Sequence, residues 1–230
     1  MKIYGLQKLT LLDYPKKTAC TIFTGGCNFR CPFCHNALLV TDLDGAESYS
    51  EEEILEFLSK RQGLLDGVCI TGGEPLLNAD ITGFIAKIKA LGFCVKLDTN
   101  GTFPQKLKEL IENGLVDYVA MDIKNTKEKY AQTAGVEMPG LEEIEQSIRI
   151  LMQSNIDYEF RTTVVKEFHS EEDIEKIAEW IKGAKGYYLQ NFEDSGNTIC
   201  KDLHPVYSDV LKKMRERAKA FVQNTQTRGV

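Results

Sequence analysis

Three closely spaced cysteines are the strongest chemical signal in the chain: Cys27, Cys31 and Cys34, within the segment CNFRCPFC. Thiolates are soft ligands that select zinc or iron–sulfur clusters. The loop begins after Gly25-Gly26 and contains Pro32, so it can turn all three sulfur atoms towards one point. Ordinary buried thiols explain this spacing less well, and the segment therefore predicts a metal centre.

This centre has three candidate protein ligands rather than four. A structural zinc site or a simple electron-transfer cluster normally has a fourth ligand. His35 follows Cys34 directly, but a residue next to a ligand seldom points at the same metal, and His169 and His204 lie far along the chain. We therefore expect one metal position to stay open for chemistry. Three other cysteines lie in apolar runs, where we expect core packing, and a fourth is isolated: Cys20, Cys69, Cys94 and Cys200, in that order.

Short apolar, β-branched runs alternate with stretches of helical periodicity. The runs are residues 18–24, 68–71, 93–97, 118–123, 158–165 and 187–190. Because they read as apolar throughout, they predict parallel strands covered by helices. Six strand–helix units are too few for a closed eightfold barrel, which leaves a partial, open barrel or a doubly wound sheet. In both folds ligands gather at the carboxyl ends of the strands, and the cysteine loop follows the first strand directly.

The stretches between the runs carry helix signals. Ser50 and Glu53 form a capping box, Ser170 can cap a later helix, and Asn113-Gly114 would end another. We expect a last helix at about 205–223. The chain is expected to be one α/β domain over residues 1–230, with its core at about 16–195.

Polar motifs stand where these strands end. Thr71-Gly72-Gly73-Glu74-Pro75 ends the second strand, Asp98-Thr99-Asn100-Gly101 the third, and Asp122 and Lys124 the fourth. Glycines let a backbone approach a ligand, and carboxylates suit ammonium groups. Simple turns or a solvated ion pair would also explain these motifs. Arg161 lies inside the fifth apolar run and needs an anionic partner, which a ligand carboxylate or an internal glutamate would supply.

Composition narrows the classes of partner. The 230 residues include 28 basic and 34 acidic side chains, a net charge of −6, so we expect no nucleic-acid partner. The N-terminal segment has no signal-peptide pattern, and no run approaches the roughly 20 apolar residues of a membrane span. Seven cysteines are an odd number, which suits a reducing compartment. We expect a cytoplasmic protein that does not act at a membrane.

The cysteine segment has the C-x₃-C-x-aromatic-C pattern of the radical S-adenosylmethionine superfamily. The stretch GLQKLTLLDYPKKTACTIFTGGCNFRCPFCHN, residues 5–36, closely resembles the anaerobic ribonucleoside-triphosphate reductase activating proteins, which are relatives of pyruvate formate-lyase activating enzyme. The likeness covers nearly the whole chain and weakens after about residue 190. It implies a partial (β/α)₆ barrel of parallel strands with outer helices. It also implies one [4Fe–4S] cluster on Cys27, Cys31 and Cys34, and S-adenosylmethionine as a second cofactor.

The resemblance also implies roles for the strand-end motifs. Gly72-Gly73-Glu74-Pro75 is similar to the family's GGEP motif, whose backbone and glutamate hold the methionine amino group of S-adenosylmethionine. Asp98-Thr99-Asn100 resembles the segment near the ribose and near a monovalent cation site.

Further implied contacts lie on the later strands, and two segments depart from the best-known relatives. Asp122 and Lys124 resemble the D-x-K that meets the methionine carboxylate or the cation, and Arg161 would serve that carboxylate. Gln190-Asn191 stands where pyruvate formate-lyase activators place a histidine near the cofactor. Asp13-Tyr14-Pro15 replaces a glycine-rich segment.

The function implied is activation of a glycyl-radical enzyme, with an anaerobic ribonucleoside-triphosphate reductase as the leading partner. An external donor of the flavodoxin or ferredoxin type would supply one electron to the cluster. Reductive cleavage of S-adenosylmethionine would yield a 5′-deoxyadenosyl radical, which takes a hydrogen atom from a glycine of the partner. Two alternatives stay open: a radical enzyme acting on a small molecule, and a non-catalytic zinc or redox-binding module.

Overall fold

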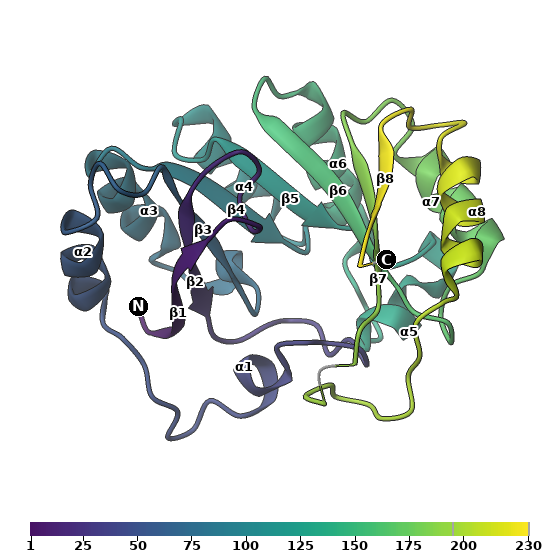
Figure 1. Cartoon of the computed structure of the whole chain (residues 1–230), viewed down its shortest axis with the longest axis horizontal. Helices are drawn as coiled ribbons and strands as arrows, with labels where there is room; N and C mark the ends of the chain where they lie inside the picture. Colours follow the sequence, from purple (N-terminus) through teal and green to yellow (C-terminus); the bar gives the residue numbers. More distant parts are fainter. Residues whose placement is uncertain (195, 230) are drawn as a thin grey trace.

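The computed structural model describes residues 1–194 and 196–229. Its centre is an eight-stranded sheet in which the strands lie side by side in sequence order, from β1 to β8. β1 (Ile3–Thr10) runs antiparallel to β2 (Ala19–Thr24), and every later pair is parallel. The sheet is curved, its two edge strands do not pair, and helices cover its outer side (Figure 1). The predicted α/β partial barrel is confirmed.

All six predicted strands are present, with ends within one or two residues of those expected. They are β2, β3 (Gly67–Gly72), β4 (Cys94–Thr99), β5 (Tyr118–Asp122), β6 (Asp157–Val164) and β7 (Tyr187–Asn191). The sequence did not predict β1 or β8 (Thr225–Arg228). β8 is a four-residue, polar TQTR segment, and β1 mixes buried and exposed positions, so neither forms an apolar run.

Helices connect the strands, and most of them pack on the outer side of the sheet (Figure 1). They are α1 (Ala37–Thr41), α2 (Glu51–Ser59), α3 (Ile81–Ala90), α4 (Pro104–Glu112), α5 (Tyr130–Ala134), α6 (Leu141–Gln153), α7 (Glu171–Trp180) and α8 (Ser208–Ala218). The Ser50 capping box and the Ser170 cap are confirmed, and α4 ends just before Asn113. The last helix is shorter than the predicted 205–223, because the chain turns after Ala218 to enter β8. No helix in the described ranges is both long and apolar enough to cross a membrane.

The two faces of the sheet differ in chemistry. The outer face packs against the helices with buried apolar side chains such as Ile70, Leu97 and Met121. The alternate positions point to the concave face, because successive side chains of a strand point to opposite sides. Most of these are polar: Thr21, Cys69, Lys96, Asp98, Tyr118, Asp122, Glu159, Arg161, Tyr188 and Gln190. The interpretation of the strands as apolar throughout is therefore wrong, since it holds only for the outer face.

Candidate functional site

One pocket lies at the carboxyl ends of the parallel strands. Thirteen of the fourteen site residues expected from the sequence line it: Cys27, Cys31, Cys34, Gly72, Gly73, Glu74, Asp98, Thr99, Asn100, Asp122, Lys124, Arg161 and Gln190. Pro75 is the exception, because it is buried at the start of the 3₁₀ turn η1 (Pro75–Leu77). Residues from six strand ends therefore meet around one space, as the fold class predicts.

Backbone contacts hold the cysteine loop in position. The carbonyl oxygen of Gly26 accepts a hydrogen bond from the N–H of Glu74 at 2.8 Å. Further along the loop, the N–H of Arg30 donates to the carbonyl of Ala134 at 2.9 Å, at the end of α5. The next residue, Gly135, has a φ of +68°, and a Cβ there would lie 2.1 Å from the Arg30 oxygen. Two segments distant in sequence thus fix the loop from both sides.

The glycine pair at the end of β3 packs directly on the chain that leads to Cys27. A Cβ on Gly73 would lie 1.9 Å from the carbonyl oxygen of Gly26, and a Cβ on Gly72 would lie 2.3 Å from that of Thr24. Gly72 also has a φ of +116°, which side-chain-bearing residues rarely adopt. The N–H of Gly73 donates to the Thr24 carbonyl at 2.9 Å. The close approach that these glycines allow is therefore to the cysteine loop itself.

Burial favours the protonated form of the three thiols. It raises the pKa of Cys31 to about 11, and it also raises the pKa values of Cys27 and Cys34. Such thiols stay protonated at neutral pH until a metal ion displaces the proton. The N–H of Phe29 points at the Cys27 sulfur at 3.3 Å, and the side-chain amide of Asn100 lies 3.9 Å from it. These donors suit a metal-bound thiolate, so the donor set fits a thiolate-held metal group.

The thiols line a cavity rather than converge on one atom. Within residues 1–194 and 196–229, no three side chains of histidine, cysteine, aspartate or glutamate lie close enough to share one ion. Ligands of a single zinc ion lie about 4 Å apart. His35, the residue after Cys34, stacks on Phe192 with ring centroids 5.5 Å apart. His35 therefore packs on an aromatic ring and also lines the pocket.

Glu74 is buried and joins the ends of β3 and β4. Its Oε1 accepts from the Leu76 N–H at 3.1 Å and from the Thr99 hydroxyl at 2.8 Å, and its Oε2 accepts from the Asn100 N–H at 2.7 Å. Burial raises the pKa of Glu74 to about 7, although these three donors oppose the shift. The carboxyl group therefore has a structural role of its own, and only Oε2 retains clear capacity for a further donor.

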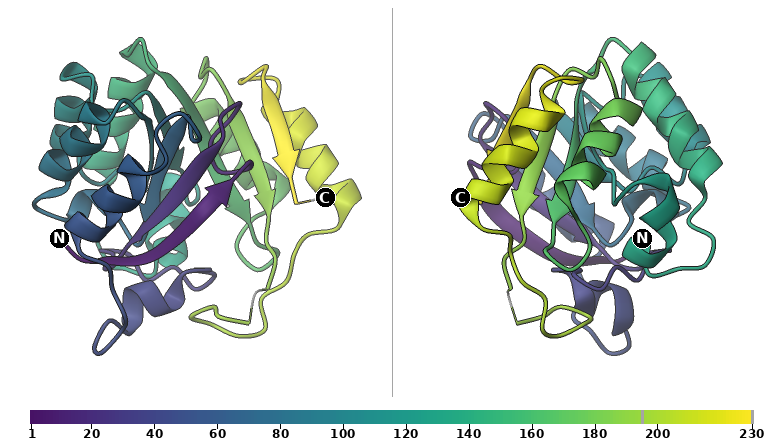
Figure 2. Two further views of the ribbon diagram at one scale, coloured as in Figure 1. Left: turned by 60° about the vertical axis from the view of Figure 1, so that its left-hand side comes forward. Right: turned by 90° about the vertical axis from the view of Figure 1, so that its right-hand side faces the viewer.

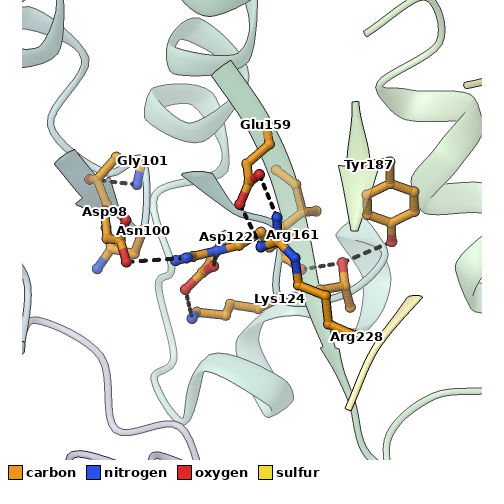
Figure 3. A network of polar contacts seen from close by, with 12 residues as sticks. Asp98, Asn100, Gly101, Asp122, Lys124, Glu159, Arg161, Tyr187 and Arg228 are labelled. Atoms are coloured by element: carbon orange, nitrogen blue, oxygen red, sulfur yellow. Dashed lines mark hydrogen bonds and ion pairs between the residues drawn. The ribbon is translucent and has the colours of Figure 1, made fainter. Parts of the chain in front are cut away.

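A charged network lies on the concave face of the sheet (Figure 3), and most of its residues line the same pocket as the three thiols. Arg161 donates to Asp122 at 2.9 Å and to Asp98 at 3.1 Å, and Lys124 donates to Asp122 at 3.0 Å. Lys96 forms an ion pair with the other oxygen of Asp98. Burial alone would raise the pKa of Asp122, but Arg161 and Lys124 outweigh it and hold that pKa at about 2. Three cations and two carboxylates leave this network with a surplus positive charge.

A second ion pair lies on the same face, and its carboxylate, Glu159, stands two residues before Arg161 in β6. The Arg228 guanidinium donates to both oxygens of Glu159 at 2.8 Å, and the Tyr118 hydroxyl donates to the same carboxylate at 2.8 Å. Glu159 is buried, and the Arg228 guanidinium lies 3.8 Å from the ring centroid of Tyr188. This pair joins β8 to β5, β6 and β7, which explains how a short polar strand is held in the sheet.

Three features of the concave face were not predicted from the sequence: Lys96, Glu159 and the polar surroundings of Cys69. Each charged residue stands two positions before a residue that was singled out, Asp98 or Arg161, and so shares its face. That spacing was the available signal. Cys69 does not pack in the apolar core, because its sulfur lies 3.7 Å from the Lys96 amine.

The structure distinguishes Gln190 from Asn191. The Asn191 amide is bound to the backbone of Val206, through both its oxygen and its nitrogen at 3.1 Å. Gln190 lines the pocket beside Thr163, its partner in the β6–β7 register. Gln190 is therefore the one of the two residues that lines this pocket.

The sequence pattern of the radical SAM superfamily matches residues 21–181, a range that includes the cysteine loop and most of the pocket. The chain belongs to the radical SAM superfamily. Radical SAM enzymes use a [4Fe–4S] cluster and S-adenosylmethionine, and the thiol-lined pocket fits the first of these. The expectation of these two cofactors is confirmed at the level of the family.

Other comparisons place this radical SAM chain among enzymes of several kinds. A Methanocaldococcus jannaschii protein, provisionally named a glycyl-radical enzyme activating enzyme, is 37% identical over 237 residues, which cover 99% of this chain and 96% of that protein. A GTP 3′,8-cyclase of Helicobacter pylori is 31% identical over 205 residues, which cover 84% of this chain and 58% of the cyclase. Streptococcus suis SuiB bound to S-adenosylmethionine has a similar fold, with a TM-score of 0.70 at 17% identity over 90% of this chain and 49% of that chain.

Gly73→Ala tests the packing of β3 on the cysteine loop. The new methyl group would meet the Gly26 carbonyl at 1.9 Å, so the loop must shift. We expect the free energy of unfolding to fall by about 1–3 kcal/mol and the iron bound per chain after reconstitution to fall by more than half. Gly83→Ala is the matched control, because a Cβ at Gly83 in α3 meets nothing within 4 Å. Iron content equal to that of wild type in Gly73→Ala would contradict this account.

Asp122→Asn tests the charged network through pH. The pKa of Asp122 is held at about 2, below its unfolded value near 3.9, so its ionised form stabilises the fold above about pH 4. That contribution is lost as the pH falls towards 2. We expect the substitution to lower the free energy of unfolding by on the order of 2 kcal/mol at pH 7, and by progressively less below pH 4. Urea unfolding of the cluster-free chain at several pH values measures this, with the exposed Asp44→Asn as reference. A deficit that stays constant down to pH 2.5 would refute it.

Proposed function

We propose that this chain is an activating enzyme that generates a glycyl radical on a partner enzyme, an anaerobic ribonucleoside-triphosphate reductase. The observation that carries the proposal is that the cysteine loop and the charged network line one pocket at the carboxyl ends of the strands. Similarity over nearly the full length of the M. jannaschii protein supports glycyl-radical chemistry rather than another radical reaction.

In this proposal Cys27, Cys31 and Cys34 each ligate one iron of the cluster, and the fourth iron is left to S-adenosylmethionine. When bound, the two cofactors together supply a 5′-deoxyadenosyl radical by one-electron reductive cleavage of S-adenosylmethionine. The protein contributes binding, orientation and exclusion of water around them. Support for the ligand assignment comes from the anchoring of the loop at Gly26 and Arg30, which holds the three thiols towards the pocket.

The methionine end of the cofactor would bind between two groups of opposite charge. The Gly72-Gly73 backbone and the free capacity of Glu74 Oε2 suit its ammonium group. The surplus positive charge of the network around Arg161 and Lys124 suits its carboxylate, which would compete with Asp98 and Asp122 for these cations. Asn100 would lie near the ribose, and Gln190 would act where relatives use a histidine.

The reducing electron would come from a donor of the flavodoxin or ferredoxin type. The glycine of the partner would reach the pocket along the concave face, between β1 and β8, which are the two edges of the sheet (Figure 2). That face is polar, so it can bind the backbone of an entering segment through hydrogen bonds.

A radical enzyme acting on a small molecule is the second candidate. The similarity to the GTP 3′,8-cyclase favours it, since 84% of this chain takes part. The two candidates differ in whether the radical leaves the chain to reside on a protein.

Electron paramagnetic resonance under anaerobic conditions tests the proposed function. Reconstituted protein, dithionite and S-adenosylmethionine are mixed with an anaerobic ribonucleotide reductase. We expect a glycyl-radical doublet with the wild-type chain and with Cys200→Ala, whose cysteine is exposed, but none with Cys31→Ala.

Other results would count against the proposal in distinct ways. Formation of 5′-deoxyadenosine without a doublet would reject this partner and favour the small-molecule reaction. A doublet that survives Cys31→Ala would reject the assigned cluster ligands.

A further inference from the structure

The end of β1 and the turn that leads to β2, residues 8–17 and together called the β1–β2 turn below, expose an unusual concentration of leucine. Leu9, Leu11 and Leu12 have 57%, 72% and 91% of their surface exposed to solvent. Large exposed apolar side chains gathered on one short segment are typical of protein–protein contact sites. None of the three leucines belongs to the hydrophobic core, so their exposure does not help this chain to fold.

The turn is nevertheless ordered. The N–H groups of Leu12 and Asp13 both donate to the Thr10 hydroxyl at 3.2 Å, and the Thr21 hydroxyl donates to Asp13 at 2.5 Å. Tyr14 is buried at the base of the turn, with its ring 6.1 Å from that of Tyr118. The leucines are therefore displayed on a preorganised support, which lowers the entropy cost of binding a partner.

The leucines are accompanied by positive charge. Lys8, Lys16 and Lys17 lie on the same turn, whereas its one carboxylate, Asp13, is already engaged by Thr21. Lys16 has a φ of +62°, a conformation that costs free energy for any residue other than glycine. Strained backbone of this kind occurs most often at functional positions. The chain as a whole has a net charge of −6, so this basic turn stands out locally.

The position of the turn suits a docking role. β1 is one edge of the sheet and β8 is the other, and Figure 2 shows the β1–β2 hairpin and β8 on either side of the concave face. The turn precedes β2, whereas the cysteine loop follows it, so the two lie about 20 Å apart along this strand. A protein that inserts a segment along the concave face would meet this turn with its surface, away from the cofactor pocket.

We infer that the β1–β2 turn is a docking surface for the partner protein that receives the radical, and that it binds an apolar patch bordered by carboxylates. This inference rests on the proposed function. The leucines supply the buried contact, and Lys8, Lys16 and Lys17 speed the encounter and select an acidic surface. The complex therefore weakens as salt concentration rises.

Steady-state formation of the glycyl radical at varied partner concentration tests the inference, with dithionite as the reductant and anaerobic ribonucleotide reductase as the probe. We expect Leu12→Glu to raise KM for the partner at least about tenfold. Its kcat and its 5′-deoxyadenosine formation without partner should stay at wild-type values. Lys16→Gly should also raise KM, although it relieves the backbone strain and does not lower the melting temperature. Met138→Glu is the matched control, because Met138 is 90% exposed but lies between α5 and α6.

Three outcomes would contradict the docking inference, and only one of them would also reject the proposed function. Unchanged KM in Leu12→Glu and Lys16→Gly, with radical formation intact, would overturn the docking inference and leave the proposed function standing. A wild-type dimer that Leu12→Glu converts to monomer would make the turn a contact between two copies of this chain, and would also overturn it. No radical from the wild-type chain would reject the proposed function, and the docking inference with it.

Discussion

The site depends on one backbone contact, between the end of β3 and the residue before the first cysteine. Glu74 donates its N–H to the carbonyl of Gly26, and this bond is possible because neither Gly72 nor Gly73 has a side chain. The contact sets the position of Cys27 relative to the ends of the neighbouring strands. Glu74 then extends the same constraint to β4 through Thr99 and Asn100. The Gly72-Gly73-Glu74 motif therefore packs β3 against the cysteine loop, and this packing forms one wall of the pocket.

The concave face of this sheet differs in chemistry from the interior of a closed barrel. In a closed barrel of this type the interior is filled with branched apolar side chains. Here it carries charged side chains in ion pairs. Lys96, Asp98, Asp122 and Arg161 pair with one another, and Glu159 pairs with Arg228. Buried ion pairs contribute little net stability because desolvation offsets their attraction. Arg161 and Lys124 can, however, exchange these carboxylate partners for a charged ligand that enters the pocket.

Much of the fold and of the site could be predicted from the chain alone. The apolar runs predicted six strands, because their outer faces are buried by helices whatever the function. The cysteine spacing and strand-end motifs predicted the pocket residues, because local sequence determines both the loop and its strand. β1 and β8 were missed since edge strands need no apolar run. Lys96 and Glu159 were missed although each stands two positions before a residue that was singled out and so shares its face. The contact between Arg228 and Glu159 was missed because it joins strands far apart in sequence, which no local pattern contains.

The central proposal is that three thiols hold an iron–sulfur cluster in which one iron is free to bind S-adenosylmethionine. The most direct test is the electron paramagnetic resonance spectrum of the reduced, reconstituted protein, recorded with and without S-adenosylmethionine beside an iron determination. The account predicts about four irons per chain and a cluster signal whose g values change when S-adenosylmethionine is added. A cluster signal indifferent to S-adenosylmethionine, or a colourless protein with one zinc ion per chain, would contradict it.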